Sequence, residues 1–384
     1  MSEGIRRHEL ASVSVIVPTY NRARFLGESL DAIIGQLAEQ DEIIVVNDGS
    51  EDDTGNVLNS YSPNVRIIEQ ANAGKSAALN HALPEATGDF VWIVDDDDIV
   101  CPDARNRLVD ALLATPNAGL AYGRHDRFID DVVTGQRRFL DTGYWCDCEP
   151  EEFLCATLED FFVHQPGMMV RRELYQTAGP FAEVYSEDYD MLIRLAKLAE
   201  PISIPGILFH QRQHDGIRGS AAEPVKIERR NDAWINVGQM IISHHMKELP
   251  LEMFVAERKL DNEIATRRAL LQRAVIFARH GLWMEAAREF TQAAEQSPYP
   301  LTDIERDLIK RVSFSKFEME SFLADDAAKR QFSILAKSKG VGRSIVRRIG
   351  RSLVWRIRES HNHGRPFLAT KYAQRAIQMW ILGR

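Results

Sequence analysis

Residues 90–98 read Phe90-Val91-Trp92-Ile93-Val94-Asp95-Asp96-Asp97-Asp98, a short apolar run that ends in four carboxylates. An apolar run of this length without helical spacing predicts a strand buried in a parallel sheet. The acids then lie at the carboxyl end of that strand, where ligands bind in open α/β sheets. Adjacent carboxylates repel one another unless a cation neutralises them, so one interpretation is a site for Mg²⁺ or Mn²⁺. The other is a solvated acidic turn before the helix expected over 102–114.

The chain before this stretch alternates apolar runs with helix-like stripes. Strands are expected over 12–17, 42–46, 65–69 and 90–94, and a helix is expected over about 22–40. The first run ends at Pro18-Thr19-Tyr20-Asn21 and the second at Asn47-Asp48-Gly49-Ser50. This alternation predicts a doubly wound parallel sheet, and it brings these two strand ends and the acidic run to one edge.

Glycine-rich phosphate loops are absent from the sequence. No G-x-G-x-x-G follows the first strand and no G-x-x-x-x-G-K-[ST] occurs, so a Rossmann dinucleotide site and a Walker ATPase are unsupported. The acidic run also lacks the glycine and the distal glutamate of an EF-hand. A nucleotide-diphosphate site held by a metal remains.

Length and composition fit a globular protein with one large and one smaller domain, since 45% of the 384 residues are hydrophobic and 27% are charged. No run approaches the roughly 18 apolar residues of a membrane span and no signal peptide is recognisable, so a cytosolic location is expected.

The four cysteines are expected to be free thiols. A zinc site is the alternative, although its residues lack paired knuckle spacing: Cys146, Cys148, Cys155 and His164.

Charge is distributed unevenly along the chain. Residues 337–384 contain twelve Lys or Arg and a single acid, Glu359, which gives +11. The whole chain carries −9, so residues 1–336 carry −20. An acidic body argues against nucleic-acid binding there.

Five blocks, in this order, resemble family 2 glycosyltransferases of the GT-A fold, over roughly residues 12–219. They are Val15 to Arg22, Val45 to Thr54, Asn72 to Asn80, Gly88 to Asp98 and Ser186 to Leu195. The resemblance implies a Rossmann-like central sheet, followed here by an α-helical C-terminal region. Asn47 departs from the family pattern, which usually has a second aspartate there.

The resemblance implies a nucleotide site made of Pro18, Thr19, Tyr20, Asp48, Lys75, Asp95 and Asp96. Tyr20 is similar to the aromatic that stacks on uracil, and Asp48 to the carboxylate that accepts from the uracil N3–H. A carboxylate cannot accept from the unprotonated N3 of cytosine, so a UDP-sugar donor is expected. Lys75 resembles the cation near the base or diphosphate; the alternative is a solvated lysine at a helix start.

The same resemblance assigns the metal and the base. Asp95-Asp96-Asp97 looks like the family's DxD signature, with Asp96 toward the ribose and Asp97 on Mg²⁺ or Mn²⁺. His214 resembles the histidine of the R-x-H segment, with a solvated loop histidine as the alternative. Asp188, beside Glu187, is similar to the general base of sugar transfer with inversion. Favourable first-turn acids of a helix are the alternative.

These residues predict an inverting, metal-dependent transferase that moves a sugar to a hydroxyl of a glycan or lipid-linked acceptor, in polysaccharide or glycoconjugate synthesis. The processive Q-x-x-R-W motif is absent. A nucleotidyltransferase on a related fold would need a glycine-rich, basic first loop, which Pro18 to Asn21 is not. A degenerate glycan-binding scaffold is disfavoured by the intact acids. Trp145 is either a sugar-stacking platform or a packing residue.

The rest of the chain is predicted to be helical. A catalytic domain is expected over 1–220, an accessory helical domain over 221–330 and a basic amphipathic tail over 331–384. The region around Gly281 resembles one tetratricopeptide-type hairpin. In the tail, apolar positions 345/346, 349, 353 and 357 keep helical spacing and arginines flank them. A second segment, Tyr372 to Leu382, adds Ile377, Met379, Trp380 and Ile381. This pattern favours peripheral attachment to the cytoplasmic face of an anionic inner membrane; packing on the acidic body is the alternative.

Overall fold

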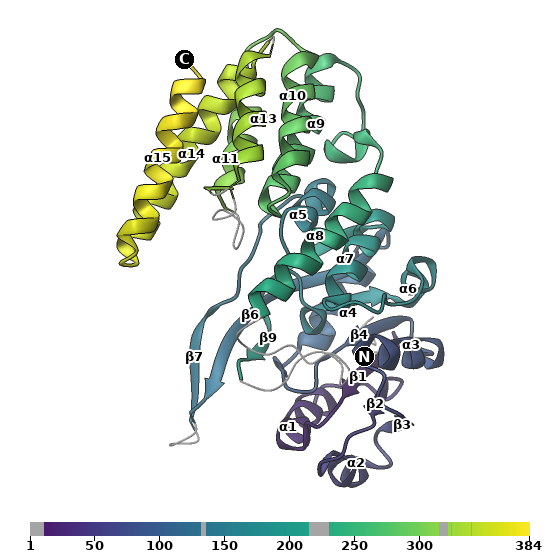
Figure 1. Ribbon diagram of the computed structural model, residues 1–384. Helices are drawn as coiled ribbons and strands as arrows, with labels where there is room; N and C mark the ends of the chain where they lie inside the picture. The colour runs from purple at the N-terminus through teal and green to yellow at the C-terminus, as the bar shows by residue number, and fades with distance from the viewer. Residues whose placement is uncertain (1–10, 132–135, 215–229, 315–321, 324, 339) are drawn as a thin grey trace. The chain divides into compact units, whose positions relative to one another are not determined.

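The computed structural model describes residues 11–131, 136–214, 230–314, 322–323, 325–338 and 340–384 (Figure 1). The chain divides into two compact units. The first contains Met1–Thr157 and Phe161–Arg230, and the second contains Leu158–Asp160 and Asn231–Arg384. The domain boundary expected between residues 220 and 221 lies outside the described residues. Residues 331–384 belong to the second unit.

The first unit is built on one sheet, whose strands in the described residues follow the order β3-β2-β1-β4-β8-β6-β9-β5, with β7 paired to β6. The strands are β1 (Val13–Thr19), β2 (Glu42–Asp48), β3 (Arg66–Gln70), β4 (Phe90–Ile93), β5 (Ile99–Val100), β6 (Ala118–Asp130), β7 (Arg137–Thr142), β8 (Met168–Arg171) and β9 (Glu200–Arg212).

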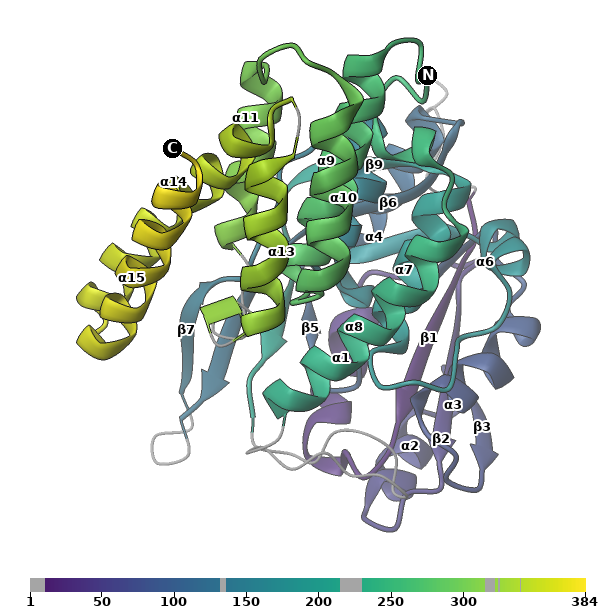
Figure 2. The same cartoon turned by 45° about the horizontal axis from the view of Figure 1, so that its top comes forward.

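The predicted parallel arrangement holds for the first four strands, because β1 pairs in parallel with β2 and β4, and β2 with β3. Figure 2 shows β1, β2 and β3 side by side. The sheet as a whole is mixed and not purely parallel, since β8 runs antiparallel to both β4 and β6. The ends of β1, β2 and β4 therefore meet at one edge, as the alternation predicts.

Short helices connect and cover these strands. Helix α1 ends at Ile34, before the expected end near residue 40, and Gly35 follows it; glycine is a poor helix former. The helices are α1 (Ala23–Ile34), α2 (Thr54–Tyr61), α3 (Lys75–Ala82), α4 (Ala104–Ala114), α5 (Phe153–Glu159), α6 (Arg172–Ala178) and α7 (Glu187–Leu198).

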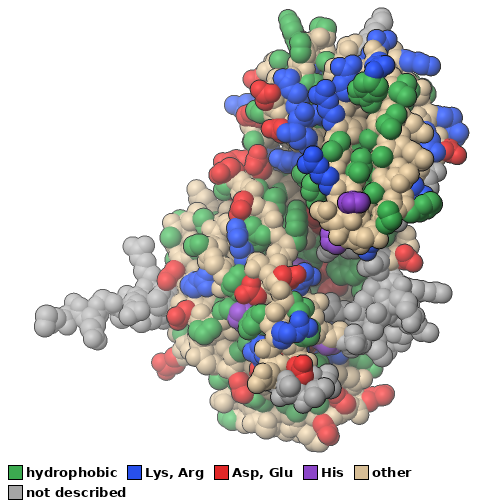
Figure 3. Space-filling view, turned by 90° about the vertical axis from the view of Figure 1, so that its left-hand side faces the viewer, with side chains coloured by type: hydrophobic (Ala, Val, Ile, Leu, Met, Phe, Trp, Pro, Cys, Tyr) green, Lys and Arg blue, Asp and Glu red, His purple; other side chains and the backbone are tan. Residues whose placement is uncertain are grey.

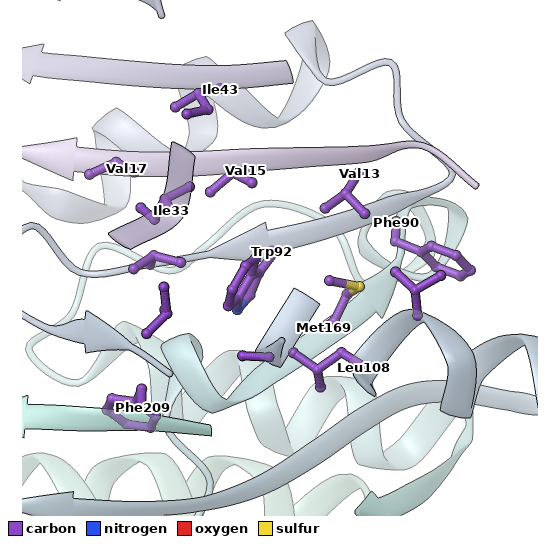
Figure 4. Close-up of a cluster of buried hydrophobic side chains, with 14 of the residues drawn as sticks. Val13, Val15, Val17, Ile33, Ile43, Phe90, Trp92, Leu108, Met169 and Phe209 are labelled. Atoms are coloured by element: carbon purple, nitrogen blue, oxygen red, sulfur yellow. The ribbon is translucent and has the colours of Figure 1, made fainter. Parts of the chain in front are cut away.

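The core of the first unit surrounds Trp92 of β4, whose side chain is fully buried (Figure 4). Its indole Nε1 donates to the carbonyl of Pro166 at 2.9 Å, so the one polar atom of the ring is satisfied. Val15, Ile33 and Met169 belong to the same cluster. The rigid core fixes β4 and thereby the position of the acidic loop that follows it.

The second unit is helical. Helices α9 and α10 form a hairpin joined at Gly281, whose φ of 72° suits a residue without a Cβ. The described helices are α8 (Arg230–Glu248), α9 (Glu263–Arg279), α10 (Trp283–Gln296), α11 (Asp303–Lys310), α13 (Asp326–Lys337), α14 (Gly342–Asn362) and α15 (Pro366–Leu382). None of these described helices combines the length and the apolar character needed to cross a membrane.

A buried ion pair holds α9 to α11. Arg267 and Glu305 are both fully buried, and Arg267 Nε donates to Glu305 Oε1 at 2.7 Å. Arg267 also donates to the carbonyl of Tyr299, while Glu305 accepts from the N-cap residue Thr302. Buried charges need this degree of pairing to offset their desolvation.

The basic tail forms a hairpin of α14 and α15. The stripe predicted to meet a membrane lies inside the unit instead, because Ile345, Val346, Ile349 and Leu353 are completely buried. Helix α14 packs against α15, α13 and α11. The apolar spacing was therefore identified correctly, but tertiary packing within the unit covers these four side chains.

Candidate active site

The four acids after β4 each face a different partner. Asp95 Oδ1 accepts from Lys75 Nζ at 2.6 Å, and Asp97 Oδ2 lies 2.7 Å from His214 Nε2. Asp96 Oδ1 lies 3.6 Å from Arg22 Nε, whereas Asp98 accepts from the backbone N–H of Arg212 at 2.9 Å. Arg22 before α1, Lys75 of α3 and His214 after β9 thus lie beside three of the four carboxylates. This arrangement contradicts the interpretation as a freely solvated acidic turn.

Asp97 and His214 form a pair suited to a divalent cation. Their facing atoms are 2.7 Å apart. Two neighbouring ligands of an octahedral Mg²⁺, each at ~2.1 Å, are separated by about 3.0 Å, so a small adjustment would admit the ion. Arg22 Nε lies 3.7 Å from the same Asp97 oxygen. The donor set, one carboxylate oxygen and one imidazole nitrogen, fits Mn²⁺ or Mg²⁺ that completes its shell with phosphate and water.

Arg212, a residue for which the sequence predicts no role, holds this pair in place. Its Nε donates to the carbonyl of Asp97 at 2.9 Å, and its other nitrogens bond Glu28 of α1 and Asp130 of β6. The buried guanidinium also lies over the ring of Phe25, 4.9 Å from its centroid. Because Arg212 is two residues from His214, these bonds fix the segment that carries the histidine.

Lys75 joins the acidic loop to the start of α7. Its Nζ lies 2.6 Å from Asp95 and 3.5 Å from Glu187. Burial would lower the pKa of Lys75, but the charges of Asp95, Glu187 and Asp188 outweigh it, so the pKa is raised and the ammonium is retained. Lys75 is therefore engaged in an ion network and is not a solvated lysine.

Asp188 lies in the first turn of α7, and its Oδ1 accepts from the backbone N–H of Tyr189 at 2.8 Å. Burial, followed by the charge of Glu187, raises the pKa of Asp188 to about 7, while Lys75 opposes the rise. A carboxyl group with a pKa near the working pH can accept a proton at an appreciable rate and remain a useful base. Asp190, two residues after Asp188, instead pairs with Arg194 at 2.8 Å.

Burial also raises the pKa of Asp96 to about 7, with a further contribution from the charge of Asp97 and opposition from Arg22. A nearby cation would lower it again, since an opposite charge favours the ionised form. The loop therefore carries carboxylates whose charges need additional positive charge.

Asp48 organises the loop that starts α3. Its Oδ1 accepts from the N–H of Ala73 and from Gln70, and its Oδ2 accepts from the N–H of Gly74, all at 2.7–2.8 Å. Only Oδ2, with one hydrogen bond among the described residues, retains a lone pair for a uracil N–H. Gly74 has a φ of 89°, a conformation that favours glycine. Asp48 thus positions Lys75 in addition to the expected role at the base.

The remaining predicted nucleotide residues lie at the same edge. Pro18 and Thr19 pair with Val46 and Asn47 across β1 and β2, and Tyr20 follows β1 with a partly buried side chain. The adjoining Asn21 accepts from the N–H of Glu51 at 2.8 Å, which ties the first strand end to the second.

Trp145 packs against neighbours and is not a free platform. Its ring centroid lies 5.4 Å from that of Tyr122, Arg124 lies over it, and its Nε1 donates to Asp147 at 2.7 Å. These contacts favour the packing alternative.

The zinc alternative fails in the described part of the chain. The one group there of three or more His, Cys, Asp or Glu residues with ligand atoms close enough for a metal is His244, His245 and Glu248 on α8. Its outer members are exposed, and it shares no residue with the proposed cysteine set. The four cysteines are free thiols, as expected.

The part of the chain that contains the strand ends of this site is similar to known proteins. The model of glycosyl transferase family 2 matches residues 14–179. An uncharacterized glycosyltransferase of Rickettsia felis is 27% identical over 207 residues, which is 53% of this chain and 34% of the relative. Chondroitin synthase of Pasteurella multocida is 26% identical over 212 residues, covering 54% and 21%. The chain thus matches about a third or less of the length of these relatives.

The fold is also found among solved structures. Residues 1–349 of TarS from S. aureus superpose with a TM-score of 0.51 at 18% identity, covering 84% of this chain and 91% of the other. This similarity establishes the fold alone. The family match identifies residues 14–179 as a glycosyl transferase family 2 region, and the first unit, which contains this region, has the GT-A fold.

Proposed function

We propose that the chain is an inverting, metal-dependent glycosyltransferase that moves a sugar from a UDP-sugar to a hydroxyl of a glycan or lipid-linked acceptor. The observation that carries this proposal is the grouping of three functions at one sheet edge. These are a metal-binding pair, Asp97 and His214, a cation, Lys75, and a carboxyl group with a pKa near 7, Asp188.

The metal would be held by Asp97 and His214, and when bound it would neutralise the charge that develops on the leaving diphosphate. Lys75 adds a fixed ammonium beside Asp95. Such preorganised charge is most effective where negative charge grows in the transition state. Arg22, 3.6–3.7 Å from Asp96 and Asp97, contributes a further cation to the same region.

Asp188 is the proposed base. In an inverting transfer the acceptor hydroxyl attacks the anomeric carbon from the face opposite the diphosphate, and its proton passes to the carboxylate. The Oδ1 atom of Asp188 already accepts from the N–H of Tyr189, so Oδ2 is the proposed proton acceptor. Glu187 is 3.5 Å from Lys75 and keeps that cation in position.

The proposed donor base is uracil. Tyr20 stacks on it, and Oδ2 of Asp48 accepts from its N3–H in this proposal. Pro18, Thr19, Asp95 and Asp96 line the rest of the nucleotide site. The named activities of relatives, chondroitin synthase and hyaluronan synthase of Pasteurella multocida, support a role in polysaccharide or glycoconjugate synthesis.

We place the catalytic domain at residues 1–220, followed by an accessory helical domain over 221–330 and the basic tail over 331–384.

The test of the metal assignment is calorimetry of UDP binding with and without Mn²⁺. Wild type is expected to bind UDP more tightly with the ion, and Asp97→Ala and His214→Ala are expected to remove that increment. Glu173→Ala on α6, an exposed acid, is the matched control. Equal Mn²⁺ dependence in all variants would refute the metal assignment.

A further inference from the structure

Helix α15 exposes an apolar stripe. The side chains of Phe367, Ile377 and Ile381 are 74%, 57% and 58% exposed. Exposed apolar side chains usually occur singly and scattered over a protein surface, whereas these three lie on one helix. They share one helical face with Lys371, whose Nζ lies 4.7 Å from the ring centroid of Phe367. The opposite face packs inside the unit through Tyr372 and Met379.

A stripe of arginines on α14 borders this helix. Arg343, Arg347, Arg351 and Arg358 follow one another at helical spacing, and Arg347 donates to the carbonyl of Gly383 at the end of α15. Arg343, Arg351 and Arg358 are exposed, and the described part of the chain offers them no carboxylate within salt-bridge distance. Their charges are therefore left for an external partner.

Acidic side chains are scarce on the hairpin. Residues 360–384 contain none, and α14 has only Glu359, which pairs with Arg356 at 2.8 Å. Figure 3 shows Lys and Arg side chains intermingled with hydrophobic ones on the side of the molecule to which α14 and α15 belong. From their exposure and helical spacing we group Phe367, Lys371, Ile377 and Ile381 of α15 with Arg343, Arg351 and Arg358 of α14, and we call this set the hairpin face.

We propose that the hairpin face docks on the surface of an anionic lipid membrane. Aliphatic and aromatic side chains bury between headgroups and acyl chains, while arginines on long stems reach the phosphates. A nucleic acid would satisfy the arginines but would leave Ile377 and Ile381 without apolar partners. A second copy would bring two basic faces together, which like-charge repulsion opposes.

The test is flotation of the full chain with vesicles, without donor or acceptor, so that it does not depend on transferase activity. Wild type is expected to float with phosphatidylcholine mixed with phosphatidylglycerol at low salt, and far less with phosphatidylcholine alone or at high salt. Each basic side chain near an anionic surface changes binding roughly five-fold, so Arg343→Gln/Arg351→Gln/Arg358→Gln is expected to weaken it about 100-fold.

A second variant tests the apolar stripe. Phe367→Gln/Ile377→Gln/Ile381→Gln is expected to weaken vesicle binding at least ~100-fold, because each side chain loses its burial in the interface. All six positions are exposed, so unchanged circular dichroism and thermal unfolding are expected. The matched control is Leu198→Gln/Met240→Gln/Ile304→Gln, which removes apolar side chains of 46%, 50% and 62% exposure from other helices and should still float.

Three outcomes would overturn the proposal. One is a wild type that stays in solution with anionic vesicles. Another is a control triple variant that loses binding as strongly as the stripe variant, because the hairpin face would then have no special role. The third is a wild-type dimer by light scattering that becomes a monomer in the stripe variant, which would make a second copy the occupant.

Discussion

Replacing Asp188 by asparagine separates the chemical step from donor binding. Asparagine keeps the shape of the side chain but cannot take a proton from the acceptor hydroxyl. Loss of a general base lowers the rate roughly 10²–10⁴-fold. UDP affinity is expected to stay unchanged, since a base acts only in the chemical step. In wild type, kcat/KM should rise with pH up to about 7, where Asp188 becomes ionised, and then level off.

The same variant should be more stable than wild type at alkaline pH. The pKa of Asp188 is about 7 in the folded chain and 3.8 in the reference state, so folding holds the proton more tightly. Wild-type stability is therefore lost as the pH rises from about 4 to about 7. At 1.36 kcal/mol for each pKa unit, the upper limit of this loss is ~4 kcal/mol. The asparagine side chain does not ionise, so the variant does not undergo this loss of stability.

The assay pairs sugar transfer with urea unfolding at pH 5 and pH 8. Asp188→Asn should gain more stability over wild type at pH 8 than at pH 5. Asp190→Asn is the matched control: its carboxylate pairs with Arg194, so the variant should lose stability and keep transfer. Undiminished transfer by Asp188→Asn would indicate that Glu187, and not Asp188, is the base. A stability difference between Asp188→Asn and wild type that does not grow with pH would refute the proposed environment of Asp188.

Three further predictions concern other parts of the molecule. Asp48→Ala should weaken UDP binding and lower stability by about 1–3 kcal/mol, measured by calorimetry and urea unfolding, since it leaves buried amides unpaired; unchanged UDP affinity would remove Asp48 from the base. Arg212→Ala should cost about 1–3 kcal/mol because the carbonyl of Asp97 loses its donor, and it should reduce the Mn²⁺ dependence of UDP binding by freeing the segment of His214. Full Mn²⁺ dependence would contradict its positioning role. Glu305→Ala should destabilise the helical unit by about 3–5 kcal/mol in thermal unfolding because the buried Arg267 loses its carboxylate partner, while UDP affinity stays unchanged.

The sequence predicts well which strand ends form the site. It predicts poorly the hydrogen bonds and ion pairs that join these ends to other segments. The position of Asp48 and of the acidic run follows from the alternation of strands and helices, which fixes the carboxyl edge of a parallel sheet. Arg212 bonds Asp97 from 115 positions away, and the pairing of β9 with β5 brings the two together. Hydrophobic periodicity identifies β8 as a strand but not its direction, so the mixed sheet could not be predicted from it.

The tail shows where sequence periodicity stops being informative. An apolar helical stripe has the same pattern whether it packs on protein or on lipid, because both remove it from water. On α14 the stripe through Ile349 and Leu353 packs inside the unit, whereas on α15 Ile377 and Ile381 remain exposed. The arginines give the distinguishing information. Arg343, Arg351 and Arg358 have no carboxylate within salt-bridge distance among the described residues, and beside exposed aliphatic side chains they suit a partner that is both anionic and apolar. A membrane surface has both properties, so the hairpin face, and not the stripe of α14, is the part of the tail to mutate.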